Sequence, residues 1–132
     1  RQDGWLKKSL LVQHFQATIT SHVIGLHTTS KVNTCLRGSI ETDVHSKLPP
    51  ELQPAQAAAN LKAYIGWYAR LVEEGYRPLL TDSNGKGGYH LDLILDAPVP
   101  SGAMYWFMKR LASNFEEWGL EKVPETVQSR MA

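Results

Sequence analysis

The most constraining feature of this 132-residue chain is the alternation of side-chain types over residues 89–96, YHLDLILD. Successive side chains of a β-strand point to opposite faces, so three leucines share one face while His90 and Asp92 share the other. A strand with one apolar and one polar face is typical of a sheet that is covered on one side only. We therefore expect a strand over residues 89–96, in a sheet with helices packed on it.

Apolar residues at helical spacing predict the helices that would cover this sheet. The predicted ranges are about 10–22, 55–74 and 101–119. Gly75 and Gly119 are expected to end the second and third helices, and Ser9 and Ser101 are candidate N-caps of the first and third. The buried stripe of the second helix is expected to consist of Leu61, Tyr64, Ile65, Tyr68 and Val72.

Short apolar or alternating runs predict further strands over 23–28, 34–45 and 77–82. The resulting order is helix, strand, strand, helix, strand, strand, helix. This order predicts an α+β fold, one sheet with packed helices, in a single domain over residues 1–132. Among the aromatic residues of the helices, Trp67 and Trp106 fall outside the expected core.

Composition narrows the class of protein. The 14 basic and 13 acidic side chains leave a net charge of +1, so a site for a polyanion must be local. The single cysteine, Cys35, excludes an internal disulfide or a cysteine-based zinc cluster and favours a cytoplasmic protein with a buried thiol. No run approaches the roughly 18 apolar residues of a membrane span, so we expect no membrane partner.

Glu41 and Asp43 form the first candidate site. Two positions apart on the strand predicted over 34–45, their carboxylates share one face, about 7 Å apart along the backbone. Hard divalent cations bind to oxygen clusters of this kind. Spacing alone favours the alternative that the pair belongs to the polar outer face of a half-exposed strand.

The glycine-rich run 83–88, SNGKGG, which is followed by His90, is the second candidate site. Glycines let backbone N–H groups approach a phosphate, and Lys86 would add a positive charge. The run lacks the spacing of a Walker loop, and a simple connection between two strands is the alternative interpretation. If the two strands are neighbours, both candidate sites lie on one sheet face.

The runs NTCLRGSIETDVH and WYARLVEEGYRPLLTDSNGKGGYHLDLILDAPVP resemble the catalytic core of the archaeo-eukaryotic primase superfamily, especially primase-polymerase-like domains. The resemblance extends from about residue 25 to residue 126, and TDSNGKGGYHL is its most specific part. It implies an RRM-like sheet. The family's Asp-x-Asp motif corresponds to Glu41 and Asp43, and its Ser-to-His loop corresponds to Ser83 through His90.

This resemblance implies divalent-metal-dependent nucleotidyl transfer, a DNA primase or polymerase activity on a nucleic acid template. Mg²⁺ or Mn²⁺ would bind to Glu41 and Asp43, whereas nucleoside triphosphates would be held by the loop and its histidine, through Ser83, Lys86, Gly87, Gly88 and His90. Glu41 stands where the family has aspartate. A helicase-like region elsewhere in a parent protein is a further partner that the resemblance allows.

The family's third acidic motif has no match before Ala132. Either the chain is a truncated piece of a longer protein, or another residue substitutes. Asp92 is the candidate substitute, because it shares a strand face with His90. Two other functions stay open: a non-catalytic nucleotide- or nucleic-acid-binding module of the same fold, and a metal-dependent nuclease, which uses the same carboxylate chemistry with water as the nucleophile.

Overall fold

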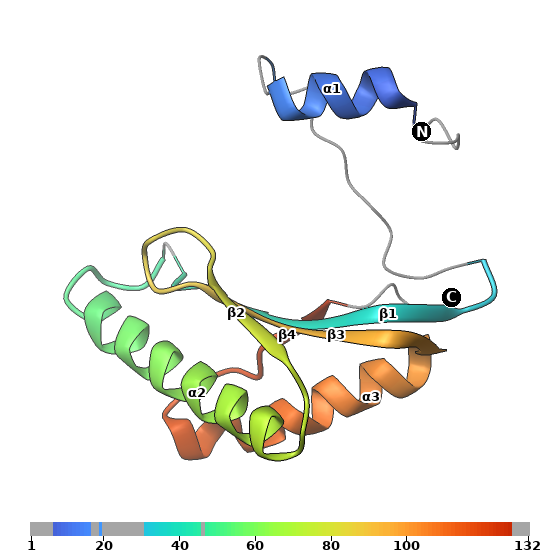
Figure 1. Cartoon of the computed structure of the whole chain (residues 1–132). Helices are drawn as coiled ribbons and strands as arrows, with labels where there is room; N and C mark the ends of the chain where they lie inside the picture. The colour runs from blue at the N-terminus through green and yellow to red at the C-terminus, as the bar shows by residue number, and fades with distance from the viewer. Residues whose placement is uncertain (1–6, 17–18, 20–30, 46, 128–132) are drawn as a thin grey trace.

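A computed structural model of the chain describes residues 7–16, 19, 31–45 and 47–127. These residues form an α+β fold with three α-helices and a four-stranded antiparallel sheet (Figure 1). In chain order the elements are α1 (Lys8–Gln16), β1 (Thr34–Thr42), α2 (Gln53–Glu73), β2 (Pro78–Asp82), β3 (Tyr89–Pro100), α3 (Ser101–Leu111), the 3-10 helix η2 (Ala112–Trp118) and β4 (Glu125–Val127).

The sheet has the strand order β2-β3-β1-β4, so the two longest strands, β1 and β3, lie at its centre. From β1 onward the elements follow the sequence β-α-β-β-α-β, which is a split β-α-β arrangement. Figure 1 shows α2 and α3 on the same side of the sheet. One face of the sheet is therefore covered by helices.

The core lies between this covered face and the two helices. Ile40 of β1 and Leu91 of β3 are fully buried there, and α3 contributes Met104 and Met108. The backbone of β1 comes so close to α3 that a Cβ atom at Gly38 would lie 2.6 Å from the Met104 sulfur. Glycine at this position therefore lets the helix approach the strand.

Helix α2 faces the sheet with a different side from the one expected. Its buried residues are Asn60, Ala63, Tyr64, Trp67 and Leu71. Of the expected stripe only Tyr64 is buried, and the other four residues are 37–52% exposed. Trp67, which was expected outside the core, is 1% exposed, while Trp106 is 60% exposed as expected. The helix has two apolar sides, and periodicity cannot tell which one meets the sheet.

Several boundaries differ from the expected ones. Helix α1 begins before Ser9 and buries none of its residues, and β1 ends at Thr42, before Asp43. Strand β3 runs four residues beyond 96, because it pairs with β1 as far as Pro100. The short strand β4 was not expected. The strand predicted over 23–28 lies outside the described residues.

The last expected helix is divided into α3 and η2, with non-helical backbone angles at Asn114. Gly119 ends it with a left-handed φ of 82°, and Gly75 ends α2 with a φ of 90°, both as expected. Ser101 is not the N-cap. Pro100 holds that position, and the Ser101 amide donates to the carbonyl of Asn33. No helix among the described residues combines the length and apolar character needed to cross a bilayer.

Candidate functional site

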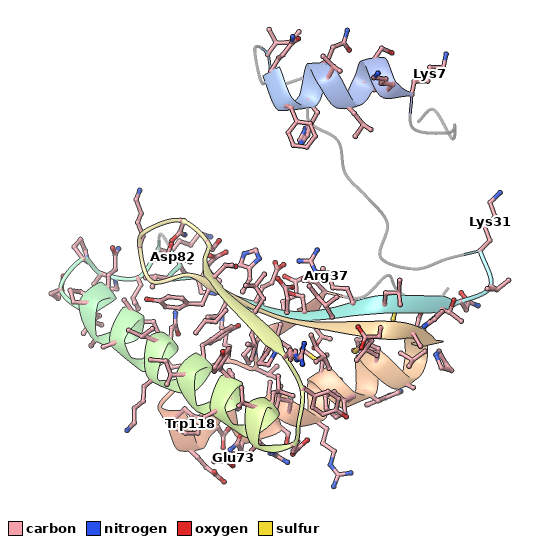
Figure 2. All side chains as sticks on the ribbon, viewed as in Figure 1. Lys7, Lys31, Arg37, Glu73, Asp82 and Trp118 are labelled. Carbon is pink, nitrogen blue, oxygen red and sulfur yellow. The ribbon has the colours of Figure 1, made fainter. Side chains whose placement is uncertain are left out.

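The face of the sheet opposite α2 and α3 carries a row of polar residues from all four strands. The register aligns Thr81 with His90, His90 with Glu41 and Glu41 with Glu125. Figure 2 shows Arg37, which has the same strand parity as Glu41, on the side of the sheet away from the helices. We call this side of the sheet the polar face.

Glu41 and His90 are in direct contact at the centre of this row. The imidazole Nδ1 of His90 lies 3.3 Å from Oε1 of Glu41, and each side chain is about one-third exposed, at 31% and 32%. The contact joins the two candidate sites, because β1 and β3 are neighbours in the sheet. The sequence analysis expects both sites on one sheet face if their strands are neighbours, and the structure shows that they are neighbours.

Asp92 lies on the same face but is bound by Arg37. Nε and Nη2 of Arg37 donate to Oδ1 of Asp92 at 2.9 and 2.8 Å. The Asp92 side chain is 8% exposed, so the guanidinium compensates a carboxylate that has lost most of its water. Its role as a third metal ligand stays a prediction, and a cation would have to compete with Arg37 for this oxygen.

The glycine-rich loop folds its own backbone donors inward. Oδ1 of Asp82 accepts from the amides of Asn84 and Gly85, and the Asn84 side-chain oxygen accepts from the amides of Lys86, at 2.8 Å, and Gly88, at 3.4 Å. These are Asx turns, in which a short polar side chain replaces a backbone partner. In this conformation the four amides are engaged within the loop.

The end of the loop packs against Asp43. A Cβ atom at Gly88 would collide with Oδ1 of Asp43, and Nδ2 of Asn84 lies 3.4 Å from the same oxygen. The carbonyl of Gly87 accepts from Nδ2 of the fully buried Asn60 at 2.8 Å, which fastens the loop to α2. The tertiary structure thus brings the carboxylate pair, the loop and the histidine together.

Tyr64 of α2 is a buried residue whose hydroxyl is influenced by the negative charges of this site. Desolvation by burial raises the pKa of Tyr64, and the negative charges of Glu41 and Asp43 raise it further. Its hydroxyl has no hydrogen-bond partner among the described residues. Tyr64 therefore remains a neutral phenol at any physiological pH.

The acidic groups of this site form only part of a metal-ligand set. Among residues 7–16, 19, 31–45 and 47–127, no three His, Cys, Asp or Glu side chains gather closely enough to hold a metal ion. Mg²⁺ commonly binds through one or two carboxylates and completes its shell with water and substrate phosphates. Glu41 and Asp43 fit this smaller requirement, and Glu125 is the register partner of Glu41 on β4.

A cavity of about 530 Å³ opens beside Asp43. It is bounded by the segment that follows β1, by α2 and by the connection from η2 to β4. Leu48 and Leu120 provide apolar walls, and the charged lining is mixed: Lys47 and Lys122 are positive, whereas Asp43 and Glu121 are negative. Small-molecule pockets commonly measure about 300–1,000 Å³, so a ligand of nucleotide size would fit this space.

Sequence reasoning did not assign a site role to Asn84, Asn60 or Glu125. Asn84 lies in the Asp-Ser-Asn-Gly run, whose residue types are typical of Asx turns, so this signal could have been found. No local sequence pattern marks Asn60, because the carbonyl of Gly87 that it binds is distant in sequence. Glu125 belongs to a three-residue strand, which is too short for a periodic pattern.

No protein-family model matches this chain, and no curated protein matches its sequence. The geometry of the polar face and of the loop is therefore the basis for a functional proposal.

Proposed function

We propose that this chain is a primase-polymerase-like catalytic domain of the archaeo-eukaryotic primase superfamily, which performs divalent-metal-dependent nucleotidyl transfer on a nucleic acid template. In this reaction a 3′ hydroxyl attacks the α-phosphate of a nucleoside triphosphate, a new phosphodiester bond forms, and pyrophosphate leaves. The β-α-β-β-α-β order and the four-stranded sheet are compatible with an RRM-like core, which supports the proposal.

One observation carries the proposal. Glu41 contacts His90 at 3.3 Å, and Asp43 contacts the loop at Asn84 and Gly88. Candidate metal ligands and candidate phosphate ligands, separated by roughly 40 to 50 residues in sequence, thus lie next to each other. Nucleotidyl transfer requires this proximity, because the reacting phosphate must contact both sets of groups.

Each group then has a distinct task. Glu41 and Asp43 would hold Mg²⁺ or Mn²⁺, with Glu125 as an additional carboxylate beside Glu41. A divalent cation supplies neutralisation of the charge that develops on the attacking and leaving oxygens. His90 and Ser83 would bind the phosphates by hydrogen bonds, and Lys86 would add a point charge. Contacts from Gly87 and Gly88 require that their amides turn toward the ligand.

A non-catalytic nucleotide-binding module is the second candidate. Two observations favour it: the loop amides are engaged by Asp82 and Asn84, and Asp92 is engaged by Arg37. A domain in this state could still bind a nucleotide through Lys86, His90 and the cavity beside Asp43. Such a module would lack the complete set of ligands that turnover requires.

Extension of a labelled primer on a template, with Mn²⁺ and nucleoside triphosphates, tests the proposal. We expect the chain to extend the primer, and we expect Glu41→Gln and Asp43→Asn each to lower the rate by about 100-fold or more. Even residues that only support metal ligands are worth about 10- to 100-fold. Asp96→Asn is the matched control, since Asp96 is an exposed carboxylate on the neighbouring strand β3.

The other outcomes separate the alternatives. Binding of nucleoside triphosphate without extension would favour the module, and cleavage of the labelled strand would indicate a nuclease. A chain that binds neither nucleotide nor Mn²⁺ at millimolar concentration would refute all three functions. Thermal unfolding of each variant shows whether a loss of activity reflects the site or the fold.

A further inference from the structure

Helix α2 carries an apolar seam that lies outside the core formed by the described residues. It consists of Leu61, Ile65, Tyr68 and Val72, which are spaced by four, three and four residues and are 37–52% exposed. This spacing is that of the a and d positions of a heptad pattern. The side of α2 that meets the sheet is a different one, formed around Tyr64 and Trp67.

A shallow apolar groove of about 460 Å³ runs beside the seam. Its walls are Leu61 and Ile65 of the seam, Ala58, Gly66, the stem of Lys62, and Trp118 of η2. Gly66 lets the Trp118 ring approach the helix, since a Cβ atom there would collide with the ring. The seam thus has a neighbouring depression that side chains of a second helix could fill.

We propose that this seam is the interface through which two copies of the chain associate, with their α2 helices antiparallel. The spacing four, three, four reads the same in both directions, so a two-fold axis between Ile65 and Tyr68 makes the seam complementary to itself. Leu61 then faces Val72 of the second copy, and Ile65 faces Tyr68. A symmetric homodimer requires a surface patch of this kind.

The charges beside the seam select the antiparallel arrangement. Lys62 and Glu73 are both exposed, lie about three turns apart and fall on the same flank of the seam. Figure 2 shows Glu73 near the end of α2, on the side away from the sheet. Parallel helices would place Lys62 and the glutamate of the second copy on opposite flanks and about three turns apart, whereas antiparallel helices place each lysine beside the glutamate of the second copy, on the same flank.

The size of the seam sets the strength of association. A standard interface covers about 800 Å² on each partner, and a seam of about three helical turns is smaller than this. We therefore expect a weak, reversible dimer. Because α2 lies on the covered side of the sheet, this dimer leaves the polar face open, and the inference does not depend on the proposed function.

Sedimentation equilibrium of the full chain, from about 1 µM to about 1 mM, tests the inference. We expect a monomer–dimer equilibrium, with Ile65→Glu raising the dissociation constant by about tenfold or more. Trp106→Glu is the matched control, because Trp106 is an equally exposed apolar residue on α3, and it should leave the constant unchanged. Circular dichroism and thermal unfolding verify that each variant is folded.

A charge exchange tests the antiparallel arrangement. Lys62→Glu and Glu73→Lys should each weaken the dimer severalfold, and the double variant should restore it. A chain that stays monomeric up to about 1 mM would overturn the inference, as would a dimer that responds to Trp106→Glu and not to Ile65→Glu. A dimer that dissociates with Ile65→Glu but shows no restoration in the double variant would overturn the antiparallel arrangement.

Discussion

The two faces of the sheet are built from the same strands and differ in what their side chains do. On the covered face, Ile40 and Leu91 have no exposed surface and lie among the residues of α2 and α3. On the polar face, their immediate neighbours Glu41 and His90 are about one-third exposed and contact each other. Residues one position apart therefore belong to environments with different dielectric properties and different energetics.

This difference teaches how a small sheet separates stability from chemistry. Burial of apolar area on the covered face supplies the free energy of folding, at roughly 25 cal/mol per Å². The Glu41–His90 pair is partly exposed, and pairs of this kind contribute about 0–1 kcal/mol. Substitutions on the covered face should therefore change stability, while substitutions of the partly exposed Glu41 and His90 on the polar face should change binding and activity with little change in stability.

The largest expected change in the free energy of unfolding is at Trp67, and Trp106 provides the comparison. Trp67→Ala should lower the free energy of unfolding by about 3–5 kcal/mol, because it empties a buried volume and removes the bond from Nε1 to Asn114. Trp106→Ala should change it by less than about 0.5 kcal/mol, because the ring is exposed. Urea unfolding measures both, and Trp67→Phe provides a milder variant if alanine prevents folding. Equal effects would contradict the assignment of the core.

An intermediate effect is expected where a buried charge lies on the polar face. Arg37→Met should destabilise the chain by about 1–3 kcal/mol, because it leaves the buried Asp92 carboxylate without this partner. The Arg37 side chain is partly exposed, so the loss should be smaller than that of a fully buried ion pair. Arg37→Met combined with Asp92→Asn should regain most of the loss. Urea unfolding of the single and double variants provides the comparison, and two additive losses would show that the ion pair is not the cause.

An effect smaller than that of Arg37→Met is expected at Tyr64, which is buried but lies close enough to Glu41 and Asp43 for their charges to raise its pKa. Tyr64→Phe should change stability by less than about 1 kcal/mol at neutral pH, because the hydroxyl has no hydrogen-bond partner among the described residues. Because the pKa of Tyr64 is raised in the folded state, the folded chain keeps the phenol proton at alkaline pH values at which the unfolded chain loses it. Stability should therefore decline as the pH rises above about 10.

The decline of stability at alkaline pH can be measured directly. Urea unfolding at several pH values between 8 and 11 or so should show a smaller decline for Tyr64→Phe than for the parent chain. Tyr68→Phe is the control, since Tyr68 is 37% exposed. Parallel declines in the parent chain and Tyr64→Phe would mean that this phenol ionises as readily in the folded state as in the unfolded state.

The polar face could be predicted because strand parity is a local property. The alternation in 89–96 places His90 and Asp92 on one face, and the same rule places Glu41 opposite Ile40. The buried thiol of Cys35 and the glycine ends of α2 and η2 are confirmed as well. Each of these depends on a residue and its immediate neighbours.

The orientation of α2 could not be predicted for a different reason. The helix offers an aliphatic side around Ile65 and an aromatic side around Trp67, and both satisfy the helical period. In the observed orientation, Asn60 binds the carbonyl of Gly87 and Trp118 packs over Gly66. These contacts join distant segments, so no window of sequence contains them.

The sequence by itself determined which residue types alternate along each strand and where the glycine and proline residues interrupt the periodic segments. Only the tertiary structure decided that β1 and β3 are neighbours, that the loop amides turn toward Asp82 and Asn84, and that Arg37 binds Asp92. The physical reason is the range of the interactions. Parity and helical period follow from the geometry of a few consecutive residues, whereas strand pairing, burial and ion pairing depend on which distant segments pack together.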